Sequence, residues 1–272
     1  MIPAAGTEER FTEADAGRWR TLEVTAPGGS DQVERLLTAL RPWLTGTPIL
    51  VRPPWSAALG KPAQVKVQLP EHADLDGTRV CIETFLRDDE GGTVVERAFK
   101  PMLERFGGPH GMAVSMAHFV AASRISLEII EATPARAERL RAVSVLLLAS
   151  ARASGAGVAA EIDWLRRYAL AQQGLTGEPA PQVGRAAYVT ASAAIARDGR
   201  DHVLATLGGD VDDWQEVQSG TWAALTRLRS AGRLSVEPEV VFATLVQMSH
   251  NRLGLLPEDN AYLAWLVALA LA

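Results

Sequence analysis

Hydrophobic residues recur with two different periods along this chain. Before residue 100 they alternate with polar residues, most clearly over 63–69, where Val65, Val67 and Leu69 share one face. The polar positions of that stretch are Gln64, Lys66 and Gln68. Such alternation predicts strands with one buried face, whereas the spacing of three and four residues that begins near residue 112 predicts helices. The predicted fold class is therefore α+β, with a β-rich N-terminal part followed by an all-helical C-terminal part.

The same patterns predict where the elements lie. Strands are expected over 19–25, 48–52, 63–69, 80–86 and 93–99, the last two joined as a hairpin through the glycine-containing turn 88–92. Helices are expected over 32–44, 112–131, 135–153, 158–172, 183–197, 199–207, 212–231, 238–251 and 258–271. We interpret residues 1–17 as a flexible arm and residues 18–272 as a single domain, strand-rich over 18–100 and helical over 101–272.

Composition is typical of a soluble globular protein, with 47 % hydrophobic and 22 % charged residues. The net charge of −5, with both signs interspersed, argues against a broad nucleic-acid-binding surface. The N-terminus lacks the pattern of a signal peptide, and the apolar stretch 261–272 is too short to span a bilayer and is expected to be a core helix. We therefore expect a cytoplasmic protein without a membrane or nucleic-acid partner.

Neither cysteine nor histidine forms a recognisable metal motif. The single cysteine, Cys81, excludes an internal disulfide and a multi-cysteine metal site, and we expect it to be a small buried residue of a strand. No two of the five histidines have the spacing of a zinc-binding helix. No metal site is predicted.

Polar residues gather near the C-terminus on a predicted helix that ends at Gly254. Val241, Leu245 and Met248 form one apolar stripe at helical spacing. A second face carries Thr244, Gln247 and His250 or Asn251, with Arg252 beside them. Buried polar groups of this kind need partners, so the cluster is either a structural hydrogen-bond network or the wall of a site.

Other candidates lie around the start of the helix over 112–131. The amides of Gly107 and Gly108 either bind an anion or form an ordinary turn. Arg105 and Arg124 are cations that either bind an anionic or polar ligand or pair with a carboxylate. His118 either faces a site or, as we expect, lies on the helix surface. These residues alone identify no activity.

Several segments together resemble the elimination domain of lantibiotic dehydratases and their thiopeptide relatives. Phe99-Lys-Pro-Met-Leu-Glu-Arg-Phe-Gly-Gly108 resembles the signature Tyr-x-Pro-Glu-x-x-Arg-Tyr-Gly-Gly, and Phe119-Val-Ala-Ala-Ser123 resembles Phe-x-x-Asp-Ser. Met248-Ser-His-Asn-Arg-Leu253 resembles His-Met-x-x-Asn-Arg-Leu. Leu50–Trp55 and Gln64–Gln68 resemble the strand pair Phe-x-Arg-Tyr and His-x-Arg-x-Arg. The segments occur in the family order from Trp19 to the end of the chain.

This chain departs from the glutamate-eliminating members of that family at the residues that handle the glutamyl group. The strand arginines fall on Lys66 and Gln68, the glutamate on Met102 and the histidine on Gln247, while Arg105 is kept. A carboxamide does not shuttle protons as an imidazole does, so glutamyl elimination by the usual route is not expected. The resemblance instead implies a thiopeptide pyridine synthase, which joins two dehydroalanines of a precursor peptide by a formal aza four-plus-two cycloaddition and then loses water and the leader peptide. No cofactor is implied.

The resemblance also implies a set of site residues. The candidate catalytic residues are Gln247, His250, Lys66, Arg105 and Tyr188. The candidate substrate-binding residues are Arg52, Trp55, Gln64, Gln68, Ser123, Arg124 and Asn251. We expect Gln247 and Lys66 to orient the reacting amide, His250 or a tyrosine (Tyr188 or Tyr262) to relay protons, and Arg105 to shape the pocket. Asn251 and Arg252 are expected to hold the helix end in place.

The implied partner is a ribosomally made precursor peptide with a leader and a dehydrated core. An exposed sheet edge or an adjacent groove in the first 100 residues would capture the leader in extended form. Arg18, Arg20 and Lys66 would suit an acidic leader. Two other functions stay open, a glutamyl eliminase and a non-catalytic leader-binding scaffold, and the sequence also allows a homodimer.

Overall fold

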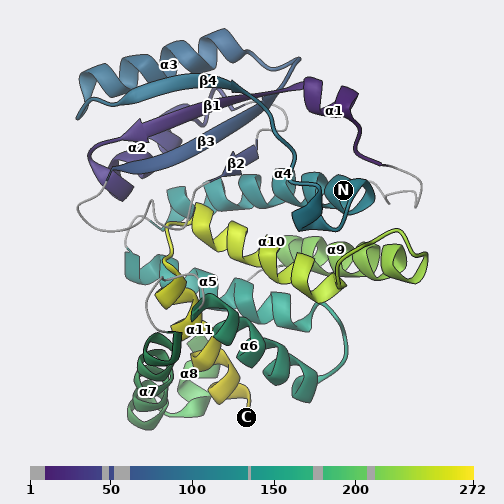
Figure 1. Cartoon of the computed structure of the whole chain (residues 1–272). Helices are drawn as coiled ribbons and strands as arrows, with labels where there is room; N and C mark the ends of the chain where they lie inside the picture. Colours follow the sequence, from purple (N-terminus) through teal and green to yellow (C-terminus); the bar gives the residue numbers. More distant parts are fainter. Residues whose placement is uncertain (1–9, 45–48, 52–61, 134–135, 174–179, 207–211) are drawn as a thin grey trace. The chain divides into compact units, whose positions relative to one another are not determined.

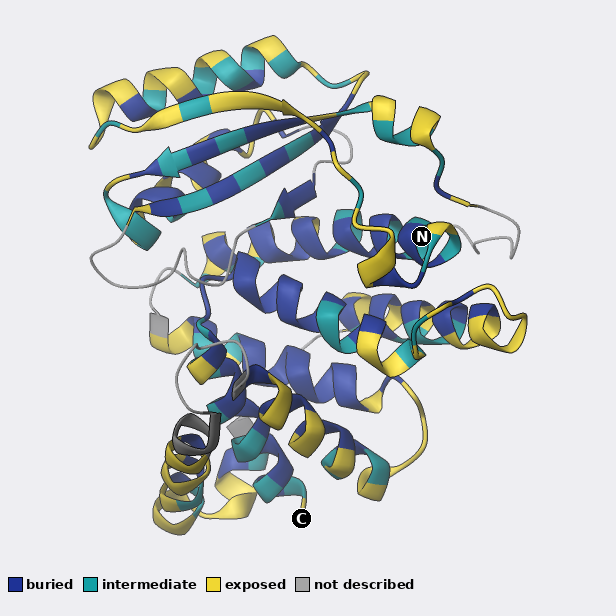
Figure 2. Cartoon of the chain, viewed as in Figure 1, coloured by how far each residue is buried: buried dark blue, intermediate teal, exposed yellow. Residues whose placement is uncertain are grey.

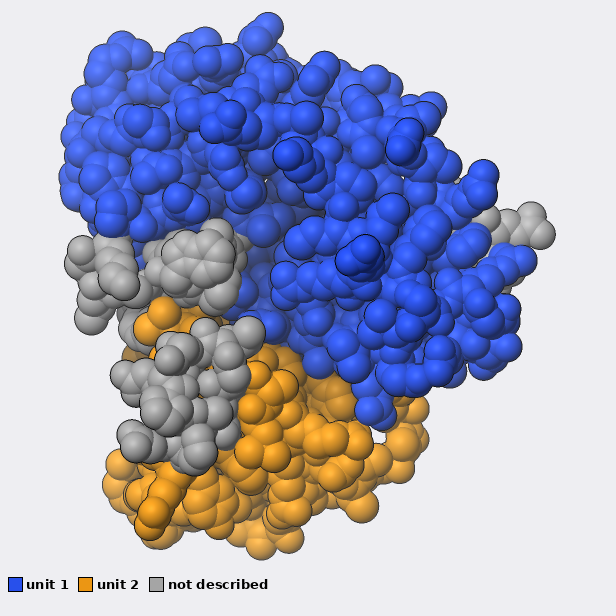
Figure 3. Space-filling model, viewed as in Figure 1, with its two compact units in different colours: residues 1–132, 224–254 blue, residues 133–223, 255–272 orange. Residues whose placement is uncertain are grey.

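The computed structural model describes residues 10–44, 49–51, 62–133, 136–173, 180–206 and 212–272 (Figure 1). The predicted site residues Arg52 and Trp55 lie outside these ranges. The chain divides into two compact units (Figure 3). The first unit comprises residues 1–132 and 224–254, and the second comprises residues 133–223 and 255–272.

A four-stranded antiparallel sheet forms the N-terminal part of the first unit. Its strands are β1 (Trp19–Ala26), β2 (Ile49–Val51), β3 (Ala63–Pro70) and β4 (Thr93–Ala98), in the order β2-β3-β1-β4. The helices α2 (Gly29–Leu40) and α3 (Leu75–Asp88) connect β1 to β2 and β3 to β4. This is the ferredoxin-like, split βαβ arrangement. Strands are confirmed where they were predicted near 19–25, 48–52, 63–69 and 93–99.

The sheet has one apolar and one polar face, as its alternation predicted. Leu22, Val24, Val65 and Val67 are buried where α2 and α3 pack on the sheet. The residues between them along each strand are less buried (Figure 2). The ion pair between Arg79 of α3 and Glu96 of β4 lies on the helix-covered side. The other face therefore carries the polar row of β3.

The predicted strand over 80–86 is wrong, because this segment belongs to α3. The buried residues Thr78, Ile82 and Leu86 are four residues apart, which is the period of a helix. The Asp74 side chain caps the helix by accepting from the Gly77 amide at 2.9 Å. The predicted hairpin is therefore also wrong, since β4 pairs with β1. Cys81 accordingly lies in a helix and is only half-buried.

Short elements connect the sheet to the helical part of the first unit. They are α1 (Glu13–Gly17), within the predicted arm, and the 3-10 turn η2 (Glu104–Phe106). The helices that follow are α4 (Pro109–Ala132) and α10 (Pro238–Arg252), which pack on each other. Among the described residues α4 alone is long and apolar enough to cross a membrane, but 56 % of its apolar window is buried, as is typical of a core helix.

The second unit is helical. Its helices are α5 (Arg136–Arg152), α6 (Val158–Gln173), α7 (Ala180–Asp198), α8 (Arg200–Thr206), the first part of α9 (Asp212–Ser230) and α11 (Pro257–Leu271). The apolar C-terminal helix α11 packs against α5, α6, α7 and α8, which confirms it as a core helix. The helices predicted from residue 112 onward are all present near their expected bounds.

Candidate functional site

The polar face of the sheet, opposite α2 and α3, carries a polar row of side chains from β3 and β1. The antiparallel register places Gln68 opposite Thr21, Lys66 opposite Glu23, and Gln64 opposite Thr25. Directly paired residues point to the same face of a sheet, so these six side chains form one surface. The predicted site residues Gln64, Lys66 and Gln68 are thus brought together.

Lys66 is neutralised within this row. Its ammonium forms an ion pair with Glu23, and the Arg97 guanidinium lies 3.5 Å from the same carboxylate. The hydrogen bond from Lys66 is the main cause of a lowered Glu23 pKa, and Arg97 contributes to it. Glu23 therefore stays ionised and fixes the position of the Lys66 ammonium. Sequence reasoning missed Glu23 and Arg97 because only the strand register shows that Glu23 meets both Lys66 and Arg97.

Arg105 lies on η2, and the two residues before this turn, Met102 and Leu103, have exposed side chains. The residue is exposed overall, yet partial desolvation lowers the pKa of its guanidinium, which stays a cation at neutral pH. Among the residues that the structure describes, none forms a hydrogen bond or an ion pair with Arg105. Its donors are therefore available to a ligand.

The glycine pair after Arg105 forms a turn. Gly107 adopts the left-handed backbone conformation, with φ of 74°. Its amide donates to the Glu104 carbonyl at 3.3 Å, and the Gly108 amide donates to the Leu103 carbonyl at 2.8 Å. Both amides are thus used within the turn, which leaves none directed at an anion.

The polar cluster on α10 is buried. Gln247 is 8 % exposed, and His250, Asn251 and Arg252 are also buried. The Asn251 side-chain oxygen has no hydrogen-bond partner among the described residues. The predicted apolar stripe of Val241, Leu245 and Met248 is buried as well. The C-terminal end of α10 is therefore buried nearly all round, and its polar side chains lie within the first unit.

Arg252 and Ser123 together close the outer edge of β2. The Arg252 Nε donates to the Leu50 carbonyl at 2.5 Å, and the Leu50 amide donates to the Ser123 hydroxyl at 2.9 Å. The Ser123 hydroxyl in turn donates to the Phe119 carbonyl at 2.7 Å. The guanidinium of Arg252 also lies over the Phe119 ring, 5.3 Å from its centroid. We call Leu50, Ser123 and Arg252 the β2 latch; substrate binding by Ser123 remains a prediction.

His118 is not the surface histidine that the sequence predicted, because its side chain is only 1 % exposed. Its Nε2 lies 3.3 Å from the Ser249 hydroxyl. Desolvation, helped by the nearby charge of Arg252, lowers the pKa of His118 to about 3. The imidazole is therefore neutral at physiological pH. The signal for this burial was the nearly uninterrupted apolar character of the helix over 112–131.

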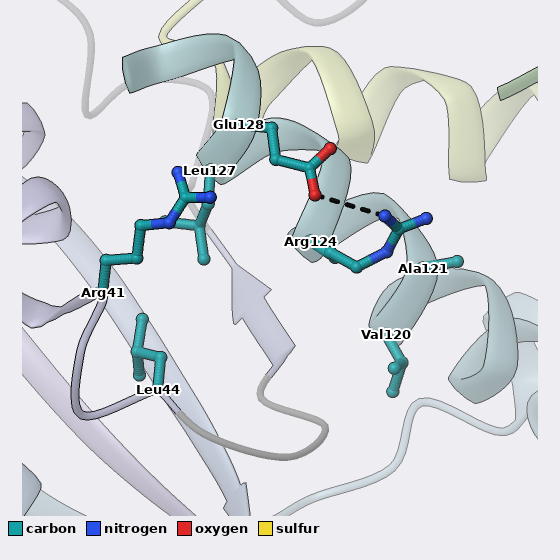
Figure 4. A pocket seen from close by; sticks show the side chains of 7 residues that line it. All are labelled: Arg41, Leu44, Val120, Ala121, Arg124, Leu127 and Glu128. Carbon is teal, nitrogen blue, oxygen red and sulfur yellow. Dashed lines mark hydrogen bonds and ion pairs between the residues drawn. The ribbon is translucent and has the colours of Figure 1, made fainter. Parts of the chain in front are cut away.

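Arg124 lines a pocket of about 220 Å³ between the end of α2 and α4 (Figure 4). The lining residues are Arg41, Leu44, Val120, Ala121, Arg124, Leu127 and Glu128. Arg124 pairs with Glu128 at 3.2 Å, and Arg41 pairs with Glu131. The pocket thus combines an apolar wall with two guanidinium groups.

Tyr188 lies in the second unit, on α7. It is 44 % exposed, and its ring meets Trp265 edge-on, with the ring centroids 5.1 Å apart. The alternative tyrosine, Tyr262, lies on α11 of the same unit, and the other predicted residues that the structure describes lie in the first unit. The predicted set is thus divided between the polar row, η2, α10 and α4 of the first unit and α7 and α11 of the second.

Known proteins share features of this sequence and fold. Residues 18–271 match the family model described as "Lantibiotic biosynthesis dehydratase C-term". A solved structure with a similar fold is the pyridine synthase TbtD from thiomuracin biosynthesis, with a TM-score of 0.67 over 93 % of this chain and 97 % of that chain. The two sequences are 14 % identical, so this likeness shows the fold alone. A comparison with curated proteins finds no sequence match. The match along almost the whole chain shows that this protein belongs to the lantibiotic biosynthesis dehydratase C-terminal family.

Proposed function

We propose that this chain is a thiopeptide pyridine synthase. The observation that carries the proposal is the shared fold over nearly the full length of both this chain and TbtD, together with the family match of this chain. Met102 and Gln247 stand where the resemblance expects the glutamate and histidine of glutamyl elimination. Both departures favour cyclisation of a finished dehydroalanine peptide over production of the dehydroalanines.

The reaction needs no outside reagent. One dehydroalanine reacts through the iminol form of its amide as a two-aza-diene, and the alkene of the second adds across it to form two bonds. Loss of water and release of the leader peptide as its carboxamide then give an aromatic pyridine. These steps are an addition and two eliminations, so they require proton transfers but no oxidant. The main task of the enzyme is to bring two alkenes of one peptide together.

The side chains in the first unit suit that task. Lys66, held by Glu23, presents ammonium hydrogens in the polar row and, with Gln247, is proposed to orient the reacting amide. Arg105 is proposed to shape the pocket, and His250, or a tyrosine of the second unit (Tyr188 or Tyr262), to relay protons. Asn251 and Arg252 are proposed to hold the end of α10.

The proposed partner is a precursor peptide with a leader and a dehydrated core. The β2 edge of the sheet is less suited to pairing with an extended leader. The backbone amide and carbonyl of Leu50, which point away from β3, are already hydrogen-bonded to Ser123 and Arg252. Strand β4 is the opposite edge of the sheet, and most of its residues are exposed. Deleting the leader should weaken binding of the peptide sharply; unchanged affinity would argue against leader capture.

Mass spectrometry tests the function directly. The purified protein is mixed with a leader-bearing peptide that contains two dehydroalanines. Loss of water together with release of the leader carboxamide is the expected result. An unchanged mass would contradict the proposal. Dehydroalanine formation from a glutamylated peptide would then identify an eliminase, and tight leader binding without turnover would identify a scaffold.

Two variants test the placement of the site. Gln247→Ala and Lys66→Ala should each lower kcat for cyclisation at least tenfold, since general acid–base and orienting groups contribute about that much or more. Gln215→Ala, an amide on α9 in the second unit, is the matched control and should leave kcat unchanged. Full activity in both site variants would show that the reaction occurs elsewhere on the protein.

A further inference from the structure

A second pocket lies at the end of the polar row of the sheet. It has a volume of about 470 Å³ and is formed by the segment before α1, α1 itself, the start of β1, the turn after β3 and α4. The register pairs Trp19 with Pro70, two positions beyond the Thr21–Gln68 pair. Alternation places Trp19 and Pro70 on the same face as Gln68 and Lys66. We call this cavity the α1 pocket; it continues the polar row.

The floor of the α1 pocket is apolar and aromatic. Phe11 and Trp19 line it and both contact Phe99, with ring centroids 6.0 and 6.3 Å apart. Met116 of α4 and Pro70 complete the floor. The Phe11 amide donates to the Pro109 carbonyl at 3.0 Å, which ties the chain before α1 to the start of α4. Ring contacts and this backbone hydrogen bond thus hold the residues of the floor together.

The rim of the α1 pocket carries two arginines with weak or no internal partners. Arg18 lies 3.7 Å from Asp15, and its side chain is 64 % exposed. Arg10 forms no hydrogen bond or ion pair with any residue that the structure describes. Asp15 is already engaged, because its carboxylate accepts from the Thr12 amide and hydroxyl at 2.8 and 2.7 Å. These hydrogen bonds hold the Asp15 carboxylate toward Thr12.

The turn after β3 supplies the remaining polar rim, Glu71 and His72. The Glu71 amide donates to the Arg18 carbonyl at 2.7 Å, which joins this turn to the start of β1. The Glu71 carboxylate is exposed and can accept hydrogen bonds from peptide amides. The rim therefore offers cations for an acidic side chain and an acceptor for a backbone.

The combination of Trp, Phe, Met and Arg side chains is typical of the centres of protein–protein interfaces. We propose that the α1 pocket docks an acidic segment of the precursor peptide, with an apolar or aromatic side chain on the Phe11–Trp19 floor and carboxylates on Arg10 and Arg18. This docking rests on the proposed function for the identity of the peptide. A segment held there is positioned at the end of the row that contains Gln68 and Lys66.

Fluorescence anisotropy tests the docking without catalysis. The probes are fluorescein-labelled peptides: acetyl-Asp-Leu-Glu-Phe-Asp-Leu-amide, its Asn/Gln analogue and its Lys analogue. The full chain should bind the acidic peptide at least tenfold more tightly than either analogue, and added salt should reduce this difference because the charges are exposed. Equal binding of the three peptides would overturn the proposal.

Charge reversal locates the binding. Arg10→Glu combined with Arg18→Glu should weaken acidic-peptide binding at least tenfold. Trp19→Leu should also weaken this binding, because it removes an aromatic side chain from the floor of the α1 pocket. Arg166→Glu, an exposed arginine of α6 without a partner among the described residues, is the control and should change affinity less than twofold. Circular dichroism confirms that each variant is folded. An unchanged affinity in the folded double variant would show that the peptide does not dock in the α1 pocket.

The cyclisation assay separates this docking from the proposed function. If ring formation proceeds and the double charge-reversal variant has an unchanged KM, the function stands and the docking is wrong. If no ring forms but binding depends on Arg10 and Arg18, the docking stands and the function is wrong. A raised KM with an unchanged kcat supports both.

Discussion

Arg252 carries a charge inside the first unit, where it is only 1 % exposed. Burial lowers the pKa of its guanidinium to about 9, so the group remains charged at neutral pH. The Leu50 carbonyl, the Ser249 hydroxyl and the Phe119 ring surround it. A buried cation is tolerated only with such partners, which gives Arg252 a structural role independent of any substrate.

Replacing Arg252 should therefore affect folding before it affects chemistry. Arg252→Met keeps an unbranched apolar stem but leaves the buried Leu50 carbonyl without its donor. We expect a loss of about 1–3 kcal/mol in the free energy of unfolding, measured by urea denaturation. Arg124→Met is the matched control, because Arg124 is exposed and its ion pair with Glu128 contributes no more than about 1 kcal/mol. Equal losses in the two variants would contradict the structural role.

His118 should make stability depend on pH. Its pKa is lowered to about 3 in the folded protein from a usual value of 6.5, so below pH 6.5 the unfolded chain binds a proton that the folded protein excludes. Stability is thus complete above pH 6.5 and falls as the pH drops toward 3, by up to about 1.4 kcal/mol per pH unit from this group.

Urea denaturation between pH 7.5 and 4.5 measures this effect. His118→Gln removes the titrating group, so the variant should show a shallower loss of stability with falling pH than the natural protein. The comparison is between slopes, which separates the proton effect from any constant loss caused by the substitution. Identical slopes would show that His118 does not titrate as its burial predicts.

At the scale of elements, the β2 latch explains how the short strand β2 (Ile49–Val51) is held against α4 and α10. Ser123→Ala removes the acceptor of the buried Leu50 amide, which should cost about 1–3 kcal/mol of unfolding free energy and speed hydrogen exchange at Leu50. If Ser123 instead binds substrate, KM for cyclisation should rise while Leu50 exchange stays slow. Hydrogen exchange measured by NMR therefore distinguishes the structural role from the predicted substrate-binding role.

The corner between η2 and α4 depends on close packing at glycine. A Cβ added at Gly111 would lie 1.8 Å from the Phe106 carbonyl oxygen and 2.7 Å from Leu234 Cδ1. Because the first contact is with backbone, Gly111→Ala should destabilise the protein by about 1–3 kcal/mol or more in thermal or urea unfolding. Gly17→Ala is the control, since a Cβ there has no neighbour within 4 Å and stability should be unchanged or slightly higher. Equal stabilities would show that the corner can relax.

Helices with strong periodicity were predictable from sequence, and α3 shows why one was not. Val80–Leu86 is rich in apolar and β-branched residues and has the length of a strand. Its helical period becomes visible only when Thr78 is included with Ile82 and Leu86, and its start only when Asp74 is recognised as a cap. Short apolar runs are ambiguous because their side chains can be buried equally well in a strand or in a helix. Only the packing partner decides between the two conformations.

At the scale of the whole molecule, the order of the strands in the sheet could not be predicted from the alternation of polar and apolar residues. Alternation predicted the polar face of β3, but the register that brings Glu23 to Lys66 arises from the crossover through α2. The β2 latch similarly joins Leu50, Ser123 and Arg252 across most of the chain. The family resemblance located Arg105 and Gln247 as candidates, whereas the α1 pocket carries no motif because it forms from three separate stretches of the chain, 10–19, 70–72 and 113–116.

Whether the second unit contributes a group to the reaction is testable at Tyr188. Tyr188→Phe removes the hydroxyl and keeps the ring that contacts Trp265, so stability should be unaffected. If Tyr188 relays protons, kcat for cyclisation should fall at least tenfold with KM unchanged, which steady-state kinetics measures. Tyr262→Phe on α11 is the matched variant and tests the other candidate tyrosine. Loss in Tyr188→Phe alone would place a catalytic group in the second unit; full activity in both variants would assign proton transfer to the first unit and leave His250 as the candidate.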